Sequence, residues 1–261
     1  MKQFVINSKP DKNGHLRFEG GDYRYLVRVR RLAPGEYFPA LLPGAVDTVN
    51  VRVLSVDNNV LIGEISDEKP SQKEASVSKN NLPPIILFQS LPKGEKMDLI
   101  VRQASEGGIE QIVPFMSEFS AIKNKNSWHK FTRWERIIKE ARQQSGSLTP
   151  TVIRQSMSID NLFVFWEEIN AQNSGVLGLL FHHLPLAKTS LHGYLYKKPE
   201  IVALAIGPEG GFSDSEAQRF MAAGFKPITI GETILRTETA ALYAQAAVRI
   251  LLLERDSWEM K

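Results

Sequence analysis

The sequence predicts an α/β protein in which a parallel sheet follows a small β module. Between Gly35 and Ile65, apolar and polar residues alternate in short stretches with the period of two that is typical of strands. The next stretch, Ser66 to Pro84, is polar and ends in two prolines, which cannot continue regular structure. Beyond it, apolar runs alternate with amphipathic segments, as strands alternate with helices. We therefore expect domains over residues 1–70 and 85–261, joined by a linker over residues 71–84.

The β module is predicted from one alternation and one turn. Valines alternate with polar residues over residues 49–53, so a strand there has one apolar face. Asp57-Asn58-Asn59 favours a turn, because Asn and Asp tolerate the backbone angles that tight turns require. The apolar stretch Val60 to Ile65 then supplies the next strand.

The second domain carries the pattern of a parallel sheet. Near-continuous apolar strands that are separated by helices are typical of such sheets, because helices cover both faces. The apolar runs are Ile85–Phe88, Gln111–Phe115, Val176–Phe181, Ile201–Ile206 and Pro227–Ile230. Apolar residues at helical spacing between the second and third runs predict an amphipathic helix there; they are Phe131, Trp134, Ile137, Ile138 and Ala141.

The last helix, expected over Ala240 to Leu253, is apolar on nearly all sides. Gln245 and Arg249 are the main exceptions. One side of this helix can pack on its own sheet, so another side needs a different cover. A second copy of the chain is the candidate.

Composition excludes several classes of protein. The chain has 261 residues and no Cys, so disulfides, thiolate metal sites and a cysteine nucleophile are impossible. It begins without the long apolar stretch of a signal peptide, and no apolar run approaches the roughly 20 residues that span a bilayer. We expect a cytoplasmic protein that needs neither a membrane nor a metal. The net charge of +3 is compatible with nucleic acid.

The sharpest motif is a glycine-rich turn that follows a buried strand. The run Ile201–Ile206 leads into Gly207-Pro208-Glu209-Gly210-Gly211-Phe212. Ser213 and Glu216 then form the capping box that begins a helix. Glycines without Cβ atoms let a ligand lie against the main chain, and ligands of open α/β sheets bind at these carboxyl ends of strands.

A second loop repeats this arrangement one strand later. Gly224 ends the preceding helix, Pro227–Ile230 forms a strand, and residues 231–240 form a loop before the last helix. Two such loops side by side would make a pocket. Neither loop has a phosphate-binding motif, neither Gly-x-Gly-x-x-Gly after a strand nor a Walker lysine. The pocket therefore suits a small, mostly uncharged ligand such as a nucleoside.

These blocks resemble the RsmE family of the SPOUT superfamily, the 16S ribosomal RNA uridine N3-methyltransferases. The carboxy-terminal resemblance rests on Ile206–Phe212 with Glu216, and on Ile230-Gly231 with Ile234–Ala240. Earlier blocks extend the resemblance over nearly the whole chain; they are Tyr25–Arg31, Pro92–Met97, Ser105-Glu106 and Pro114.

The resemblance implies an architecture and a cofactor. The fold would be a small PUA-like β-barrel followed by a SPOUT-type parallel α/β domain with a carboxy-terminal trefoil knot, in a homodimer. True knots are rare, so only the resemblance predicts one. The cofactor would be S-adenosylmethionine, which leaves as S-adenosylhomocysteine. Its expected contacts are Leu180, Phe181, Ile206, Gly207, Pro208, Glu209, Gly210, Gly211, Ile230, Gly231, Ile234, Leu235, Arg236, Thr237, Thr239 and Ala240.

The chemistry of such an enzyme is an in-line displacement that needs no metal. The methyl group on a sulfonium is already activated, so the protein chiefly holds the base nitrogen about 3 to 3.5 Å from it. Uracil N3 must lose its proton before it attacks. Arg236 could stabilise the resulting anion, while Glu238 could orient the arginine or accept the proton. The same two side chains could instead form a purely structural ion pair.

RNA contact is predicted from local charge. If Tyr25 to Leu32 is helical, Arg24, Arg28 and Arg31 share one face. Residues 120–155 hold eight Lys and Arg against two Glu, an excess that a phosphate backbone would attract. The expected RNA-binding residues are Arg24, Arg28, Arg31, Lys93 and Arg142. A solvated charged face is the alternative for both basic segments.

The sequence also departs from the family pattern outside the two cofactor loops. Gly107 replaces the leucine of a Glu-Leu-Gly block, Phe119 the arginine of Glu-Arg-Ser, and Tyr25 a histidine. Gln143 and Ser147 stand where a Glu-Gln-Ser-x-Arg block has its acid and its arginine. Our interpretation is methylation of N3 of a uridine in small-subunit ribosomal RNA. Two alternatives stay open, a different RNA position and a non-catalytic RNA-binding assembly factor. No nucleophile elbow supports a hydrolase.

Overall fold

The computed structural model describes residues 3–6, 8–45, 47–66, 82–120, 128–183 and 189–254, and only the backbone of Trp128 and His129. The chain divides into two compact units. One comprises Met1–Lys79 with Arg142–Leu148, and the other comprises Asn80–Ala141 with Thr149–Lys261. Most of the linker that we expected over residues 71–84 lies outside the described residues.

The first unit is built on a curled five-stranded sheet in the order β1-β3-β4-β5-β2. The strands are β1 (Phe4–Val5), β2 (His15–Phe18), β3 (Tyr37–Leu41), β4 (Thr48–Asp57) and β5 (Val60–Ser66). β4 and β5 form the predicted hairpin, and Asn58 and Asn59 at its turn both have positive φ angles. The rings of Phe4 on β1 and Phe18 on β2 are 5.7 Å apart. The sheet therefore curls until its two edge strands meet through their side chains.

The helical segment of the first unit ends before Arg31. Helix α1 (Gly20–Tyr23) continues into the π-helix η1 (Arg24–Val29), so the condition for a shared arginine face, a helix from Tyr25 to Leu32, is only partly met. Arg31 lies beyond the helix with φ +57°. The N–H of Leu32 donates to the carbonyl of Leu26 at 3.1 Å, which closes the helix end. Arg31 therefore does not share the helical face of Arg24 and Arg28.

The second unit confirms the predicted parallel α/β sheet. Its strands run in the order β12-β10-β11-β6-β7-β8, with β9 paired to β7, and every pairing is parallel. The bounds are β6 (Ile85–Ser90), β7 (Gln111–Met116), β8 (Val152–Ile153), β9 (Met157–Ser158), β10 (Val176–Phe181), β11 (Ile201–Ile206) and β12 (Lys226–Ile228). β8 and β9 have two residues each, too few to show a periodicity in the sequence.

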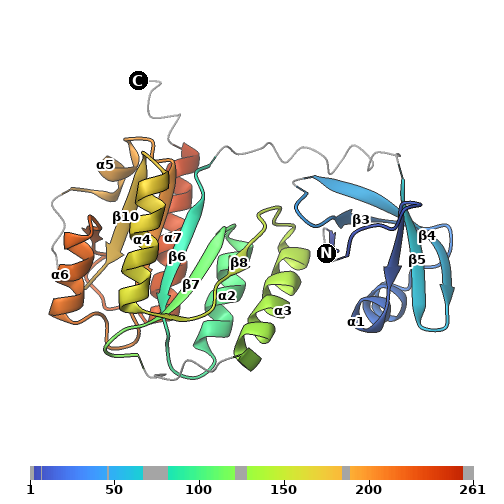
Figure 1. The fold of residues 1–261 in the computed structure, drawn as a ribbon, viewed down its shortest axis with the longest axis horizontal. Helices are drawn as coiled ribbons and strands as arrows, with labels where there is room; N and C mark the ends of the chain where they lie inside the picture. The colour runs from blue at the N-terminus through green and yellow to red at the C-terminus, as the bar shows by residue number, and fades with distance from the viewer. Residues whose placement is uncertain are drawn as a thin grey trace. The chain divides into compact units, whose positions relative to one another are not determined.

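Helices cover both faces of this sheet. Their bounds are α2 (Lys96–Glu106), α3 (Trp128–Ser145), α4 (Ile159–Gln172), α5 (Leu191–Leu195), α6 (Asp214–Ala222) and α7 (Thr237–Glu254). One core joins the sheet to residues of α2, α3, α5 and α7, and a second core joins its other face to α4 and α6. Figure 1 shows α4 and α7 on opposite sides of the strands. Alternate residues of each strand supply the two cores.

The last helix begins earlier than predicted. α7 begins at Thr237, so residues 237–240 are its first turn and not part of the preceding loop. The N–H of Ala240 donates to the carbonyl of Arg236 at 2.8 Å. Glu238 stabilises this turn because an acid at a helix N-terminus opposes the helix dipole.

The outer face of α7 is apolar, as the sequence indicated. Leu242, Tyr243, Ile250 and Leu253 are 37–53% exposed, and Ala246 and Ala247 are exposed beside them. Nothing within the described part of the chain covers this face. In the same part of the chain, no helix is both long and apolar enough to cross a membrane.

Candidate cofactor site

A cavity of about 310 Å³ lies at the carboxyl ends of β10 and β11. Two loops form most of its wall: the first loop, residues 207–212, follows β11, and the second loop, residues 229–236, follows β12. Phe181 and Ile206, the last residues of two paired strands, lie at its base. The complete lining is residues 181–183, 206–212 and 229–235, with Thr237 and Ala240.

Most of the predicted cofactor residues line this cavity, and three do not. Leu180 packs into the core beneath α4 and α6, because successive strand residues point to opposite faces and Phe181 points to the cavity side. Arg236 is exposed, and Thr239 is half-buried on the first turn of α7. The lining residues that sequence reasoning missed are His182, His183, Phe212, Thr229, Glu232 and Thr233. They adjoin the predicted ones, so extending each block by two or three residues would have found them.

The first loop folds tightly back on its own main chain. A Cβ atom on Gly207 would lie 3.0 Å from the carbonyl carbon of Gly211, so a side chain at residue 207 would push the backbone of Gly211 aside. Gly211 has φ +71°, which favours glycine. Its N–H donates to the carbonyl of Pro208 at 3.0 Å and closes the turn. The glycines are thus required by the fold of the loop as well as by access to the main chain.

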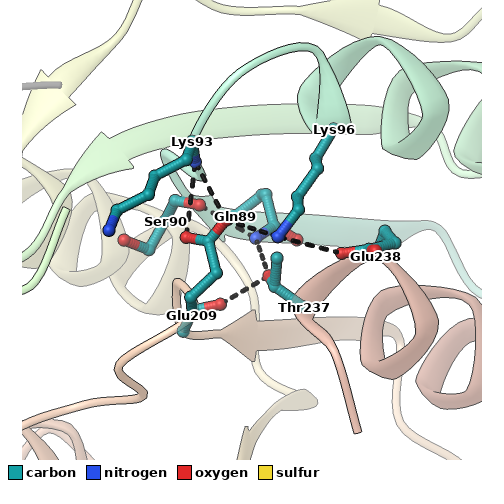
Figure 2. Close-up of polar contacts among 8 residues, drawn as sticks. Gln89, Ser90, Lys93, Lys96, Glu209, Thr237 and Glu238 are labelled. Carbon is teal, nitrogen blue, oxygen red and sulfur yellow. Dashed lines mark hydrogen bonds and ion pairs between the residues drawn. The ribbon is translucent and has the colours of Figure 1, made fainter. Parts of the chain in front are cut away.

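Glu209 anchors the first loop to the turn between β6 and α2. Figure 2 shows its carboxylate between Lys93 and Lys96. The N–H of Lys93 donates to its two oxygens at 3.1 and 3.3 Å, and Nζ of Lys96 donates to Oε1 at 2.7 Å. Burial by itself would raise the pKa of Glu209, but the bonds and charge of Lys96 and the Lys93 N–H outweigh it and lower the pKa. Glu209 is therefore an ionised anchor.

The two predicted catalytic side chains do not meet. Lys96 is the partner of Glu238: its Nζ lies 3.9 Å from Oε2 of that half-buried residue. In the part of the chain that the structure describes, no ion pair joins Arg236 to Glu238. Residues two positions apart at a helix start point in different directions. Lys96 thus lies between the carboxylates of Glu209 and Glu238, and Arg236 is exposed.

A threonine hydroxyl joins three distant segments beneath the cavity. Oγ1 of Thr237, which is buried, donates to the carbonyl of Gly207 at 2.6 Å and accepts from Nε2 of Gln89 at 3.0 Å. Figure 2 shows Thr237 beside Gln89. This hydroxyl therefore fixes the positions of three segments relative to one another: the start of α7, the start of the first loop and the end of β6.

A second buried network fixes the turn after β7. The hydroxyl of Ser90 lies 2.6 Å from that of Ser117 and 2.9 Å from that of Ser120. Glu216, only 4% exposed, accepts the N–H of Glu118 at 2.8 Å and the N–H of Ser213 at 3.1 Å. The predicted capping box at Ser213 and Glu216 is confirmed, and it also ties α6 to this turn.

The two adjacent histidines at the cavity stack on one another. The ring centroids of His182 and His183 are 4.5 Å apart. Burial, together with the neighbouring His183, lowers the pKa of His182, so its imidazole is neutral near pH 7. Within the described residues, no group of three or more His, Asp or Glu side chains could hold a metal ion.

The predicted RNA-binding residues differ in accessibility. Arg24, Arg28, Arg31 and Lys93 are exposed. Arg142 is half-buried, and its Nη2 donates to the carbonyl of Leu148 at 3.2 Å. Burial lowers its pKa. Arg142 therefore holds the turn that follows α3, and only part of its guanidinium reaches solvent.

Comparison with known proteins identifies the family of this chain. The family model of the RNA methyltransferase domain matches residues 78–249. Ribosomal RNA small subunit methyltransferase E of Aquifex aeolicus is 31% identical over 91% of this chain and 95% of that protein. The chain belongs to the ribosomal RNA small subunit methyltransferase E family. A second relative of that name, from Synechocystis, is 31% identical over 87% of this chain and 70% of its own length.

Solved structures of this kind are similar over the whole chain. A ribosomal RNA small subunit methyltransferase E from Neisseria gonorrhoeae, crystallised with S-adenosyl methionine, has a TM-score of 0.76 at 25% identity. It covers 96% of this chain and 98% of its own. A Legionella pneumophila methyltransferase with the same bound cofactor has a TM-score of 0.77 at 26% identity, and covers 95% and 97%.

Three departures from the family pattern have a described setting. A Cβ atom on Gly107 would lie 3.0 Å from Oε1 of Gln245 on α7, so a side chain at residue 107 would press on that amide. Phe119 lies against Gly210 of the first loop. Tyr25 stacks on Phe4 in the first unit, with ring centroids 6.1 Å apart. Gln143 and Ser147 are half-buried, and no described contact explains why they replace charged residues.

Proposed function

We propose that this chain transfers the methyl group of S-adenosylmethionine to N3 of a uridine in the 16S ribosomal RNA of the small subunit. The observation that carries the proposal is the cavity between the two loops, in a chain of the small subunit methyltransferase E family. Two similar proteins have been crystallised with this cofactor. An enzyme of ribosomal RNA works in the cytoplasm, and we assign the chain to that compartment.

The cavity has the chemistry that S-adenosylmethionine requires. Glycines at 207, 210 and 211 expose main-chain donors and acceptors, while Phe181, Ile206 and Leu235 supply apolar walls for a base and a thioether chain. The carboxylate of Glu209 already accepts the main-chain N–H of Lys93 and Nζ of Lys96. The main chain therefore provides most of the polar contacts to the cofactor. When bound, the cofactor supplies a methyl group on a positively charged sulfur.

Arg236 is the proposed catalytic side chain. It is exposed and follows Leu235, which lines the cavity, so its guanidinium is available to a substrate at the rim. A uracil that has lost its N3 proton carries a negative charge, which a nearby guanidinium stabilises. Glu238, which we proposed to orient the arginine or to accept the N3 proton, lies instead beside Lys96, which also pairs with Glu209. Through that lysine it holds the start of α7, on which Arg236 depends.

The variants Arg236→Ala and Arg236→Lys test this role. We expect Arg236→Ala to lower kcat by about 100-fold or more, the usual loss for one charge-stabilising group, with the dissociation constant of S-adenosylmethionine changed less than about three-fold. Arg236→Lys should recover part of kcat because it keeps the charge. Calorimetric titration and transfer of a labelled methyl group to small-subunit RNA measure the two quantities. An equal loss of both in Arg236→Ala would show that the arginine only shapes the cavity.

The finer architecture is part of the proposal. The curled sheet of the first unit supports a PUA-like barrel, on which Arg24, Arg28 and Arg31 would contact RNA. Lys93 of the second unit is a separate proposed RNA contact. The bond from Thr237 to Gly207 brings the last helix against the loop after β11, an arrangement compatible with a trefoil knot. Residues 1–70 and 85–261 remain our proposed domains.

The apolar outer face of α7 supports a homodimer. Leu242, Tyr243, Ile250 and Leu253 are large apolar side chains on one exposed helix face, and a second copy would remove them from water. The double variant Leu242→Asp with Ile250→Asp should sediment as a monomer at concentrations at which the unmodified chain is a dimer. A monomeric unmodified chain would contradict the proposal.

A different RNA position is the second candidate, because Phe119 and Gln143 depart from the family pattern outside the cofactor loops. Mass spectrometric mapping of ribosomal RNA from cells with and without the gene separates the two. A 3-methyluridine in 16S RNA that is missing without the gene supports the first candidate. Loss of a different methylated nucleotide supports the second, and no change would contradict both.

A further inference from the structure

The turn after β7 places an aromatic ring at the edge of the cofactor cavity. Phe119 lies in the turn Ser117–Ser120 and is 48% exposed. We propose that Phe119 is the surface on which the target uracil stacks while its N3 is methylated, an inference that rests on the proposed function. The ring would contact the face of the base, so it is a substrate-positioning residue of this chain.

The ring of Phe119 is in close contact with the first loop. A Cβ atom on Gly210 would lie 2.9 Å from Cβ and 3.2 Å from Cγ of Phe119, so the two residues touch and residue 210 must lack a side chain. Gly210 also lines the cavity. Phe119 therefore packs against a segment of main chain that also borders the cofactor site. A base that rests on the exposed part of this ring is adjacent to the site.

The backbone that carries Phe119 is held from both sides. The hydroxyls of Ser117 and Ser120, on either side of it, bond to the hydroxyl of Ser90 at the end of β6. The N–H of Glu118 donates to the buried carboxylate of Glu216 at 2.8 Å. Buried side-chain networks of this kind fix a backbone in advance of binding. A ring held in advance loses little entropy when a base stacks on it.

The reaction itself calls for such a surface. N3 lies on the Watson–Crick edge of uracil, so a paired or stacked uridine must turn out of the RNA before N3 can reach a methyl donor. A base that has turned out loses its stacking partners, and an aromatic side chain replaces them. Phe offers no hydrogen-bonding group, so it holds the plane of the base and leaves its edges free for reaction.

The variants Phe119→Leu, Phe119→Trp and Phe119→Ala test this inference, with Tyr196→Leu as the matched control. Tyr196 is also an exposed aromatic residue, at 54%, and it lies outside the cavity lining. Leucine keeps an apolar side chain against Gly210 but cannot stack, whereas tryptophan can. For each variant, calorimetry gives the affinity for S-adenosylmethionine, filter binding gives the affinity for unmodified small ribosomal subunits with S-adenosylhomocysteine bound, and labelled methyl transfer gives kcat/KM.

We expect Phe119→Leu and Phe119→Ala to lower subunit affinity and kcat/KM roughly 5- to 150-fold, the equivalent of about 1–3 kcal/mol per stacked base. Cofactor affinity should stay within about two-fold. Phe119→Trp and Tyr196→Leu should match the unmodified chain within about three-fold. Full activity in Phe119→Leu, or a parallel loss of cofactor binding, would overturn the inference.

The same measurements separate this inference from the proposed function. If the unmodified chain binds small subunits but transfers no methyl group, the proposed function is wrong, and the difference in subunit binding between Phe119→Leu and Phe119→Trp still decides whether the ring stacks. If the unmodified chain does not bind small subunits, both proposals are overturned.

Discussion

The two loops of the cavity are alike in sequence character and differ in how the protein holds them. The first loop packs against its own main chain at Gly207, and the carboxylate of Glu209 fixes it to two lysines. The second loop has an exposed isoleucine, Ile234, with 81% of its surface in solvent, and a glycine at 231 with open space around it. Its firm attachment is at its end, where Thr237 bonds to Gly207.

This difference indicates a division of labour within one site. The contacts of the first loop within the protein hold it in place without a ligand, so its surface is already formed when the cofactor binds. The second loop leaves Ile234 exposed beside the cavity, and a ligand that covers this apolar side chain would stabilise the loop. Variants of the first loop should therefore disturb the protein with or without cofactor, whereas variants of the second should act mainly when cofactor is present.

The largest expected effect is that of Gly207→Ala. Its Cβ would lie 3.0 Å from the backbone of Gly211, which would have to shift, and overpacking of this kind costs about 1–3 kcal/mol. We expect cofactor affinity to fall roughly 100-fold and the free energy of unfolding in urea to fall by a few kcal/mol. Gly231→Ala is the control. It meets no atom within 4 Å but has φ +69°, so it should cost only about 1 kcal/mol. Equal effects would contradict the contrast.

Thr237→Val tests the bond that joins the first residue of α7, directly after the second loop, to the first loop. Valine keeps the shape but leaves the Gly207 carbonyl and the Gln89 amide without this partner. A buried polar group that loses its partner costs about 1–3 kcal/mol, so the free energy of unfolding should fall by that amount and cofactor affinity by about ten-fold. Thr237→Ser, which keeps the hydroxyl, should behave like the unmodified chain. Calorimetry and urea denaturation give both quantities.

Ile234→Ser tests whether the second loop depends on the cofactor for its contacts. The residue is almost fully exposed without ligand, so the free energy of unfolding should stay within about 0.5 kcal/mol of the unmodified value. Cofactor affinity should fall by about five-fold, because the serine cannot cover the ligand with apolar surface. A loss of stability without ligand would show that the second loop is already packed.

Glu209→Gln has the smallest expected effect and a pH signature. The ion pair with Lys96 is partly exposed, so cofactor affinity should fall only about two- to five-fold at pH 7. The pKa of Glu209 is lowered on folding, so its stabilising contribution is present above its ordinary pKa of 4.5 and is lost as the pH falls through the lowered value. The difference in unfolding free energy between the two proteins should therefore shrink below pH 4.5. A difference that is constant with pH would exclude the ion pair as its cause.

Periodicity and local motifs explain what the sequence could predict. The apolar runs in the second unit became a parallel sheet, and the capping box at Ser213 and the helix end at Gly224 are present, the latter with φ +93°. Each of these depends on residues that are close in the chain. The extra cavity residues at 182, 183, 232 and 233 lie directly beside predicted ones.

Contacts between distant residues could not be predicted. The pairing of Glu238 with Lys96, and not with Arg236, depends on the position of the turn after β6 relative to α7. The hydroxyl of Thr237 bonds to Gln89 and to Gly207, which lie 148 and 30 positions away from it in the chain. The contact between Phe119 and Gly210 has no sequence signal either, because glycine is required there by a side chain far away in the chain. The family resemblance implied Leu180 as a cofactor contact, although its side chain points to the opposite core.

The hydroxyl of Thr237 also has a consequence for the order of events during synthesis. Residues 229–240 are synthesised after Gln89 and Gly207, so these two residues gain the hydroxyl of Thr237 as a partner only once the start of α7 has been made. A nascent chain can complete its strands β6 to β11 and still lack a place for the methyl donor. The cofactor site is thus complete only when α7 has formed, and a chain that stops before Thr237 lacks part of that site.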